Sequence, residues 1–525
     1  MSKANIKLIK NLIKAKIHTE KDLNDFKRKI SKSFGVSPMS NRQLTLAYLD
    51  FTKNKKNKKD DKLCALLKTK KMRSLSGVAI ITIATKPYPC PGNCLYCPTE
   101  KAMPKSYLSN EPAIMRAIVN NFDPYQQTFN RIKDLKISGH PTDKLEIIVI
   151  GGTWSFLPTK YREWFIKRAF DAANGKASKN LKQAQSLNEK AKNRIIGLTL
   201  ETRPDFINEK EIAFMRELGA TRVELGIQSL DDKILKINKR GHAIQKSIEA
   251  TKLLKEAGFK ICYHLMPNLM GSTPQKDLAM FKTIFKNPNF QPDLLKIYPC
   301  VVLKESQLYK EYLKKRYKPY PEKTLNQLME KIMLSVPYYC RMQRVIRDIP
   351  APSIMAGSKT SNLRDVIDKD MAKRGKKCKD IRSREVKDLY DIKEKIYLFR
   401  IDYKASDGKE IFLSWENKDR TKLFSLLRLR IPEYALKNKP FFIKELEGAA
   451  LIREVHTYGQ LLGIGKKSIA AQHMGLGKKL IAMAEKIVRK ESASRRIAVI
   501  SGIGVRDYYR HLDYKLEGTY MVKNV

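Results

Sequence analysis

The sequence predicts an α/β protein: a partial barrel of parallel β/α units, joined to a separate α+β domain and preceded by a basic helical segment. The chain has 525 residues, too many for one ordinary core, and 42% of them are hydrophobic. Strands rich in Val, Ile and Leu alternate with helical segments in the first half, whereas strands near the C-terminus follow one another through turn signals. We expect domains at residues 1–75, 76–390 and 391–525.

The N-terminal 75 residues have a helical pattern and carry 21 Lys and Arg against 6 Asp and Glu. Residues 53–59, KNKKNKK, have no apolar anchor and are expected to form a loop, either a solvated linker or a contact to phosphates. The whole chain has a formal net charge of +50. This excess favours a polyanionic partner, with nucleic acid first, although a lysine-rich composition or adaptation to heat or salt would also produce it.

Apolar runs in the central region are expected to form buried strands, at residues 77–85, 145–152, 194–204, 222–229, 260–267 and 293–300. Helices are expected between them, for example at residues 207–220 and 242–259. Such alternation is typical of parallel sheets, and in barrels of this kind the site lies at the carboxyl ends of the strands. Residues 300–390 have a mostly helical, basic pattern, and the pattern becomes antiparallel from about residue 395.

Three of the eight cysteines lie on one short loop after the first predicted strand: Cys90, Cys94 and Cys97, with C-x3-C-x2-C spacing. Cysteines this sparse do not build a disulfide scaffold, and a cluster of three indicates a metal in a reducing cytosol. Three thiolates can hold three irons of a 4Fe-4S cluster, and the fourth iron can then chelate S-adenosylmethionine (SAM) for cleavage to a 5′-deoxyadenosyl radical. Zinc is the chemical alternative, but it needs a fourth ligand that this loop lacks. The spacing and its position predict a radical SAM enzyme.

Polar residues and glycines at the ends of the later strands fit a SAM site at the same edge of the barrel. Bare backbone after the second strand can accept hydrogen bonds from the SAM ammonium, and polar side chains further on can bind its ribose and carboxylate. Taken one at a time, these residues also fit a plain turn or a surface ion pair. The candidates are Gly151, Gly152, Thr153, Glu201, Arg203, Gln228 and Lys296.

A glycine-rich motif near the C-terminus, Gln472-His-Met-Gly475-Leu476-Gly477-Lys478, fits the pattern Q/R-x-x-G-x-G/A and precedes a helix. Glycines and a helix N-terminus together suit a pyrophosphate. A strand containing His456 precedes the motif, and a strand and then Tyr508-Tyr509 follow it, which is the order of the GCN5-related acetyltransferase fold. The motif therefore predicts an acetyl-CoA site. A tyrosine there can protonate a leaving thiolate, and at most one of the pair faces the site. For His456, a structural role is expected in preference to that of a catalytic base.

Together these features resemble one family, the catalytic subunit of Elongator and its stand-alone archaeal and bacterial relatives. The resemblance covers residues 76–525 and is carried by segments such as EPAIMRAIVNNFDPY, LTLETRPD, VELGIQS, LKIYP, VIRDIPAP, LFSLLRLR, REVHTYG, IAVISGIGVRDYYRHLDY and LEGTYMV. Three features depart from the family pattern. The cysteine spacing is the compact form, PTEK follows Cys97 where PGG is usual, and Trp154 stands where Phe is usual.

The resemblance implies an enzyme that forms 5-carboxymethyluridine at wobble uridine 34 of tRNA, from acetyl-CoA and SAM, with tRNA-dependent hydrolysis of acetyl-CoA. It implies that the three cysteines hold the cluster and that Lys144 contacts acetyl-CoA from the radical domain. Residues 1–75 with Arg341, Arg344 and Arg347 would grip the anticodon stem-loop. The implied acetyl-CoA contacts in the transferase domain are Glu454, Val455, His456, Thr457, Gly475, Leu476, Gly477, Lys478 and Tyr508.

Some members of this family carry an additional zinc ion, for which Cys300 and Cys378 are candidates here, although no histidine ligand is obvious nearby. Two other interpretations of the sequence stay open: a protein lysine acetyltransferase with a structural cluster, and a non-catalytic tRNA-binding scaffold. Methylthiolation of RNA would need a second cysteine triad, which the sequence lacks. We expect a cytoplasmic protein without a membrane span, either a homodimer or a partner of Elongator-like subunits.

Overall fold

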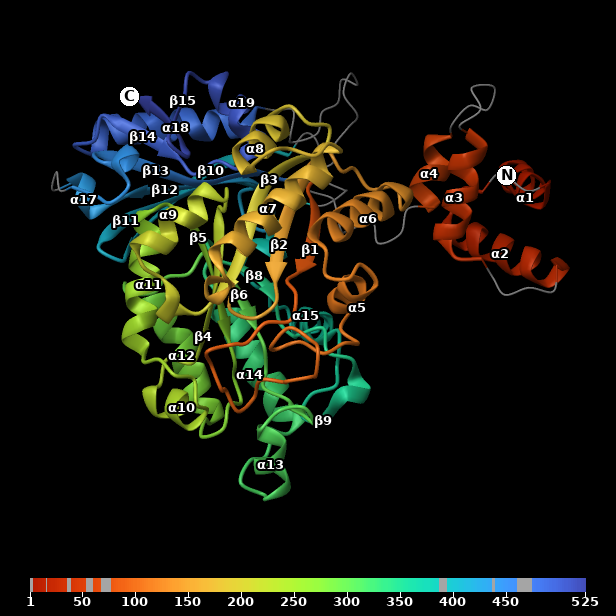
Figure 1. Ribbon diagram of the computed structural model, residues 1–525, viewed down its shortest axis with the longest axis horizontal. Coiled ribbons are helices and arrows are strands. Elements are labelled where there is room, and N and C mark those ends of the chain that lie inside the picture. Colours follow the sequence, from red (N-terminus) through yellow and green to blue (C-terminus); the bar gives the residue numbers. More distant parts are fainter. Residues whose placement is uncertain are drawn as a thin grey trace.

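The computed structural model describes residues 3–15, 17–34, 39–52, 60–67, 77–386, 394–436, 440–459 and 475–525. Two large sheets and an N-terminal group of helices make up this part of the chain (Figure 1). Among the helices of these ranges, none combines the length and the apolar character needed to cross a membrane.

The first sheet is a parallel partial barrel, as the sequence predicts. Its strands follow the order β1-β2-β3-β4-β5-β6-β8, and every neighbouring pair is parallel. Because this order begins at β1 and ends at β8, the barrel is open between those two strands. The strands are β1 (Ala79–Ala84), β2 (Lys144–Ile150), β3 (Arg194–Thr202), β4 (Arg222–Gln228), β5 (Lys260–Leu265), β6 (Leu294–Ile297) and β8 (Arg341–Arg344).

The expectation that residues 300–390 are mostly helical misses strand β8. Arg341-Met-Gln-Arg344 lacks the apolar composition of a buried strand because only Met342 faces the core, while Arg341 and Gln343 line an internal cavity. The same region also contains a short antiparallel pair, β7 (Val302–Leu303) with β9 (Ile354–Ala356).

Most of the helices of this region cover the outer face of the barrel, and several of them begin at a polar cap. The side chains of Asp123, Asn180, Asn208 and Thr273 each accept a hydrogen bond from a backbone N–H of the first helical turn. The helices are α5 (Pro112–Val119), α6 (Pro124–Ile137), α7 (Thr159–Asn174), α8 (Leu181–Glu189), α9 (Glu209–Glu217), α10 (Asp232–Ile237), α11 (Ile244–Glu256), α12 (Pro274–Lys286), α13 (Leu308–Leu313), α14 (Glu322–Ser335), α15 (Leu363–Lys373) and α16 (Ile381–Arg384).

The C-terminal region is α+β. Its sheet is mostly antiparallel, with the order β10-β11-β12-β13-β14-β16-β15. Its one parallel pair is β13 with β14. The β10–β11 hairpin turns at Ser406 and Asp407, both with positive φ, as a tight two-residue turn requires. The elements are β10 (Tyr397–Ala405), β11 (Gly408–Glu416), β12 (Leu423–Ile431), α17 (Glu433–Leu436), β13 (Ala449–Thr457), α18 (Leu476–Glu491), β14 (Arg496–Val499), α19 (Arg506–Arg510), β15 (Lys515–Glu517) and β16 (Tyr520–Asn524).

The second sheet lies at the amino ends of the barrel strands, opposite the cysteine loop (Figure 1). The 3-10 turn η7 (Ile503–Val505) packs on β3, where Gly502 comes so close that an added Cβ would lie 2.0 Å from the carbonyl oxygen of Ile196. One hydrophobic core continues from the barrel, at Phe165 and Leu225, into the second sheet at Leu451. The two sheets are therefore packed as one body.

A sealed cluster of charges also joins the sheets; we call it the junction cluster. Asp293, just before β6, accepts hydrogen bonds from Arg453 of β13, at 3.0 Å for the longer of the two, and lies 3.5 Å from Arg428 of β12. Glu410 of β11 accepts from Arg453 at 2.8 Å. The ammonium of Lys255 lies 4.0 Å from Asp293 and 3.8 Å from Glu410, without a hydrogen bond among the described residues.

The N-terminal helices are α1 (Lys3–Lys14), α2 (Glu20–Phe34), α3 (Asn41–Thr52) and α4 (Asp61–Leu67), which confirms a helical segment. They pack around a small core of their own that includes Ile9, Leu44 and Tyr48. They project from the barrel beside α6, which α3 contacts (Figure 1). The lysine run at 53–59 lies outside the described residues.

Candidate active site

A cavity of about 1940 Å³ runs through the barrel from the cysteine loop to the second sheet. Its walls come from the cysteine loop, the inner face of the barrel strands and the divergent strands β13 and β14. Both sites expected from the sequence therefore open into one space. Its lining includes Cys97, Tyr107, Lys144, Glu201, His264, Lys296, Glu454, Thr457, Gly477 and Tyr508.

The cysteine loop follows β1 and is held by contacts with the neighbouring loops. Leu95 donates its backbone N–H to Asn238 at 3.1 Å, and the backbone N–H of Cys97 donates to Cys94 at 3.1 Å. The guanidinium of Arg240, itself buried, donates to the Cys94 sulfur at 3.6 Å. Gly92 lies close to Arg203: an added Cβ would lie 2.2 Å from its guanidinium, so a side chain here would displace that group.

The three cysteine sulfurs fit a cluster better than a single zinc ion. A tetrahedral zinc with bonds of about 2.3 Å would bring its sulfur ligands to about 3.8 Å from one another. In the described chain, the one group of three metal-ligand atoms within 4.8 Å of one another is elsewhere, so at least two of the three Sγ atoms lie further apart than 4.8 Å. Burial raises the pKa of the Cys97 thiol to about 11, and bound iron would supply the charge that stabilises its thiolate.

Unsatisfied polar atoms beside the loop indicate room for a polar ligand. The Nη1 atom of Arg203, the Oε1 atom of Gln228 and the hydroxyl of Tyr96 are buried without a hydrogen-bond partner among the described residues. Gln228 ends β4 with φ of +71°, a strained backbone for a residue other than glycine. A ligand with amino, carboxylate and ribose groups, such as SAM, would satisfy these atoms.

The two glycines after β2 have the geometry that the sequence suggests. Gly151 and Gly152 have φ of +130° and +93°, and an added Cβ on Gly151 would lie 2.1 Å from the Thr85 hydroxyl oxygen. The hydroxyl of Thr153 lies 3.6 Å from the sulfur of Cys90. These residues therefore border the cysteine loop, where backbone can approach a ligand.

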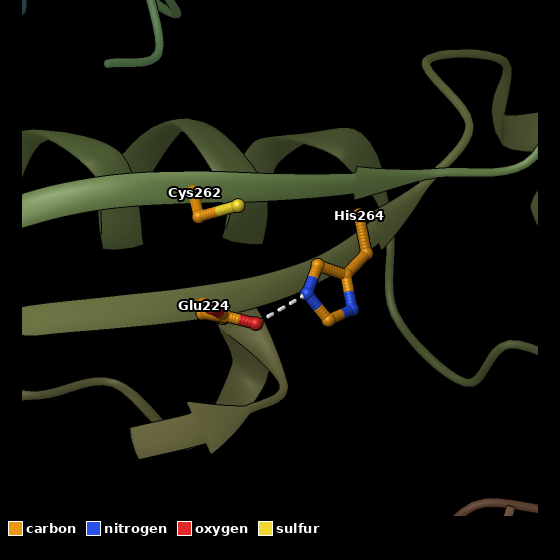
Figure 2. Close-up of side chains that lie close together, drawn as sticks. All are labelled: Glu224, Cys262 and His264. Carbon is orange, nitrogen blue, oxygen red and sulfur yellow. Dashed lines mark hydrogen bonds and ion pairs between the residues drawn. The ribbon is translucent and has the colours of Figure 1, made fainter. Parts of the chain in front are cut away.

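Inside the barrel, side chains of Glu201, Glu224, His264 and Lys296 form a buried network that we call the barrel network. His264 contacts Glu201 at 3.1 Å through Nδ1 and Glu224 at 2.8 Å through Nε2, the contact dashed in Figure 2. The ammonium of Lys296 also contacts Glu224, and the hydroxyl of Tyr107 donates to Glu201 at 2.8 Å. Burial opposes ionisation of His264, but hydrogen bonds to Cys262, Glu201 and Glu224 raise its pKa well above the usual value. The ring is therefore a cation.

Glu224, Cys262 and His264 bring three possible ligand atoms within 4.8 Å of one another (Figure 2). The neighbouring charges argue against a metal there. The ammonium of Lys296 contacts the Glu224 carboxylate, and Arg222 lies 3.6 Å from it, so cations already neutralise that group. Both ring nitrogens of His264 face carboxylates and act as donors, which leaves no lone pair for a metal.

At the other end of the cavity, strands β13 and β14 diverge. They pair over Ala449–Ile452, after which β13 continues to Thr457 beside β12 alone. Gly475, with φ of +67°, begins α18 at this opening. An added Cβ on Gly477 would lie 3.4 Å from the Tyr508 hydroxyl and 3.5 Å from the Thr457 hydroxyl. Backbone and hydroxyl groups thus surround the helix N-terminus, as in a site for a phosphorylated ligand.

The two adjacent tyrosines are in different environments. Tyr508 is 37% exposed, and its hydroxyl points to Gly477. Tyr509 is 6% exposed and packs on Tyr514 in the core of the second sheet. Burial raises the pKa of Tyr508, so its phenol keeps its proton at neutral pH. Tyr508 is therefore the one able to donate a proton at the opening.

The remaining acetyl-CoA candidates differ in their availability. Glu454 faces the cavity, but its carboxylate already binds Arg428 at 2.8 Å and Lys260 at 3.3 Å. Burial lowers the pKa of His456 to about 4, which keeps the ring neutral. Val455 lines the opening, Leu476 is buried, and Lys478 is exposed beside it. Lys144 begins β2 at the transferase-facing end of the cavity, and Gln472 lies outside the described residues.

The three arginines expected to grip RNA all line the cavity, but each is already paired. Arg341 contacts Glu385 at 2.7 Å, Arg344 contacts Asp348 at 2.8 Å, and Arg347 contacts Glu111 at 2.8 Å. Each acid offsets part of the positive charge that its arginine would offer to a phosphate, and the Arg344–Asp348 pair is the most exposed of the three. Their contact with RNA stays a prediction.

The two cysteines considered for zinc lie apart. Cys300 belongs to a hydrophobic cluster with Ile234 and Leu308, and Cys378 belongs to the main core. Within the described ranges, neither joins a group of three ligand atoms. The geometry gives no support to a zinc site at these positions.

Sequence reasoning missed the barrel network except for Glu201 and Lys296. A signal was present, since Arg222-Val-Glu224 and Cys262-Tyr-His264 place polar residues at alternate positions of otherwise apolar strands. Alternate residues of a strand face the same side, so these side chains share the inside of the barrel. Arg240, which contacts Cys94, comes from a loop and carries no such pattern.

The sequence matches the Radical SAM superfamily over residues 88–283 and the Radical_SAM C-terminal domain over residues 292–373. It is 45% identical over 477 residues to a tRNA uridine(34) acetyltransferase of Methanocaldococcus infernus, which covers 88% of each chain. It is 38% identical over 534 residues to Elongator complex protein 3 of Homo sapiens, which covers 98% of this chain and 96% of that one.

A solved structure, the archaeal Methanocaldococcus infernus Elp3 with an N-terminal deletion, is 42% identical with a TM-score of 0.75. The match covers 86% of this chain and 100% of that chain. These similarities agree with the cysteine loop, the partial barrel and the divergent strands of the second sheet. The chain belongs to the radical SAM superfamily and, within it, to the family of Elongator complex protein 3 and the tRNA uridine(34) acetyltransferases.

Proposed function

We propose that this protein modifies tRNA, and that it forms 5-carboxymethyluridine at wobble uridine 34 from acetyl-CoA and SAM by radical chemistry. The observation that carries the proposal is the single cavity, which joins the cysteine loop to the opening between β13 and β14. Relatives named tRNA uridine(34) acetyltransferase support the substrate. The proposed domains are a basic helical segment at 1–75, a radical SAM domain at 76–390 and an acetyltransferase domain at 391–525.

At the cysteine end, Cys90, Cys94 and Cys97 would hold a 4Fe-4S cluster, which supplies the electron for reductive cleavage of SAM when it is bound. The barrel residues then bind and orient SAM. The unsatisfied atoms of Arg203 and Gln228 support their roles as contacts. The proposed SAM contacts are Gly151, Gly152, Thr153, Glu201, Arg203, Gln228 and Lys296.

The barrel network keeps Glu201 ionised and aimed into the cavity. Burial opposes ionisation of Glu201, but the hydrogen bond from His264 and the charge of Lys296 hold its pKa below the usual value. The hydroxyl of Tyr107 holds the second carboxylate oxygen. A carboxylate restrained on both sides loses little entropy when it binds a hydroxyl or ammonium group of a ligand.

At the transferase end, the amide groups of Gly475–Lys478 would bind the pyrophosphate of acetyl-CoA at the N-terminus of α18. The Tyr508 phenol, which keeps its proton, would donate it to the leaving thiolate when CoA is released. Lys144 would contact acetyl-CoA from the barrel side. Thr457 supplies a second hydroxyl beside Gly477. Tyr509 also borders the cavity, but it is only 6% exposed and packs in the core of the second sheet, which favours Tyr508 for this role.

The proposal is tested by anaerobic reconstitution with iron and sulfide, reduction, and addition of SAM, acetyl-CoA and tRNA. Mass spectrometry of the digested tRNA should find carboxymethyluridine, with 5′-deoxyadenosine formed alongside, and both should disappear in Cys94→Ala. Deoxyadenosine without a modified uridine would contradict the substrate assignment. Acetylation of an added protein, with neither product formed, would favour the lysine acetyltransferase alternative.

The two tyrosines offer a matched test of the transferase end. Tyr508→Phe should slow tRNA-dependent hydrolysis of acetyl-CoA by about 100-fold, because it removes the proton donor. Tyr509→Phe should leave the rate within about a factor of two, since that hydroxyl is packed in the core. Equal losses in both variants would contradict the role given to Tyr508.

A further inference from the structure

A second pocket, of about 800 Å³, lies beside the main cavity. Residue Ser358 lines both, so the two spaces share a wall. We propose that this side pocket binds one nucleotide of the RNA, with its base stacked on tyrosine and its phosphate held by lysine, next to the uridine that enters the cavity. The inference rests on the proposed function. The pocket is lined by Tyr312, Leu313, Lys315, Tyr317, Lys318, Pro319, Tyr320, Glu322, Ala356, Gly357, Ser358, Lys359 and Thr360.

The aromatic walls of the side pocket are held in place. Tyr317 donates its hydroxyl to the backbone oxygen of Asn268 at 2.6 Å, and Tyr320 donates to Asp277 at 2.9 Å. Both acceptors lie on the loop after β5 and in the first turn of α12, which anchors the rings to the barrel. Tyr312, the third ring, is half-buried at the end of α13. Rings fixed in this way can stack a base at a small entropic cost.

The polar walls of the side pocket are positive. Lys315, Lys318 and Lys359 line it, and none has an ion-pair partner within the part of the chain that the structure describes. The one acid in its wall, Glu322, accepts a hydrogen bond from the Thr360 hydroxyl at 3.0 Å. Unpaired lysines beside aromatic rings are the combination that binds unpaired nucleotides, by phosphate attraction and by stacking.

The location of the side pocket matches a contact next to the target base. The segment that leads into α13 packs on the cysteine loop. The backbone N–H of Leu308 donates to the carbonyl oxygen of Leu95 at 2.8 Å, and the backbone N–H of Thr99 donates to the carbonyl oxygen of Glu305 at 2.9 Å. Helix α13 projects at the end of the molecule opposite the second sheet (Figure 1). An RNA strand that inserts one base into the cavity from this end would place the neighbouring nucleotide at the side pocket.

The test uses the full chain and an anticodon stem-loop RNA that carries 2-aminopurine on either side of uridine 34. Binding should quench the fluorescence of one of the two probes, because that base stacks on tyrosine. Tyr312→Ala should remove the quenching and weaken binding about tenfold. Tyr312→Phe keeps the ring and should behave like the wild type. Because Tyr312 packs against neighbouring side chains, thermal unfolding of each variant is measured alongside.

A charge variant tests the same site without touching the packing. The double variant Lys315→Gln/Lys318→Gln should weaken binding and lower the salt slope of log Kd by about 2, because each of the two lysines would neutralise one phosphate. The exposed pair Lys282 and Lys286 on α12 gives the matched control, Lys282→Gln/Lys286→Gln, which should bind RNA like the wild type.

Wild-type affinity and quenching in both Tyr312→Ala and the Lys315/Lys318 variant would overturn the inference. Equal losses in Tyr312→Phe and Tyr312→Ala would also overturn it, since stacking does not need the hydroxyl. These results are independent of the modification assay. If the wild-type protein forms no carboxymethyluridine, the proposed function is contradicted. If the wild type forms it but the variants bind RNA normally, only the role of the side pocket is contradicted.

Discussion

The barrel network and the junction cluster both hold buried charges, but they differ in their access to the cavity. Glu201, His264 and Lys296 of the barrel network line the cavity, where a ligand can meet them. Asp293 and Glu410 of the junction cluster are fully buried and do not line it, although Arg453, which pairs with both, reaches the cavity wall. The difference separates two uses of buried charge: the sealed cluster fixes how the sheets pack, and the cavity-facing network prepares a binding site.

The balance within each group differs as well. In the barrel network, two acids are balanced by two cations. His264 contacts both Glu201 and Glu224, and Lys296 contacts Glu224. In the junction cluster, Asp293 and Glu410 are already satisfied by arginines, and Lys255 makes no hydrogen bond in the described chain. The junction should therefore depend strongly on its acids and little on Lys255.

The largest effect is expected for Asp293→Asn. The change removes one of the two buried carboxylates that Arg453 contacts and the one nearest Arg428, so it leaves buried positive charge uncompensated and should lower the free energy of unfolding by roughly 3–5 kcal/mol. Urea denaturation at pH 7 would measure it. Wild-type stability in this variant would mean that apolar packing alone holds the two sheets together.

The next effect is expected for Glu224→Gln, and it should appear in activity. Without the carboxylate, His264 loses one of its two anionic partners and holds Glu201 less firmly, so SAM cleavage should fall about 100-fold in a protein that still binds its cluster. The pKa of His264 should also fall towards its usual value, which NMR titration would detect. A histidine whose pKa is raised on folding stabilises the protein below its unfolded pKa, and this gain is lost as pH rises through the folded pKa. The variant should therefore be less stable than the wild type by the full amount below about pH 6.5, and the difference should disappear once the pH exceeds the raised pKa of His264 in the folded wild type.

A smaller effect of opposite sign is expected for Lys255→Met. Burial lowers the pKa of Lys255 from 10.5 to about 8, so the unfolded chain binds this proton more tightly than the folded protein. The charged lysine thus costs stability below about pH 8, and wild-type stability should rise with pH from there to 10.5. The variant should be about 1 kcal/mol more stable than the wild type at pH 7, with the gain lost by pH 10.5. Strong destabilisation at pH 7 would refute the view that Lys255 is dispensable.

The smallest effect is expected for Asp402→Asn, an exposed control for the junction variants. Asp402 pairs with Arg400 at 2.7 Å and with Lys409 at 2.9 Å on the surface of the second sheet. Water screens such pairs, so the free energy of unfolding should change by less than about 1 kcal/mol. A loss as large as that of Asp293→Asn would remove the distinction between sealed and exposed charge.

Much of the fold could be predicted because its signals are local. Apolar runs separated by helical segments indicate parallel strands, and Gly475 with Gly477 indicates a turn at a helix N-terminus. Strand β8 escaped prediction because one of its four residues faces the core and the others are polar. The pairing of Arg341, Arg344 and Arg347 with acids also escaped, since two of those acids are far along the chain.

The sequence by itself determined the chemistry available at each end: thiols at a spacing suited to a cluster, and a glycine-rich helix start suited to a pyrophosphate. These follow from residue identity and short spacing, which the chain carries without folding. Tertiary structure alone decided that both ends open into one cavity, that Tyr508 is the more exposed of the two adjacent tyrosines there while Tyr509 is largely buried, and that His264 is held as a cation. Those properties depend on burial and on contacts between distant strands, such as Glu201 of β3 with His264 of β5, which form when the strands assemble into the sheet and curve around its polar interior.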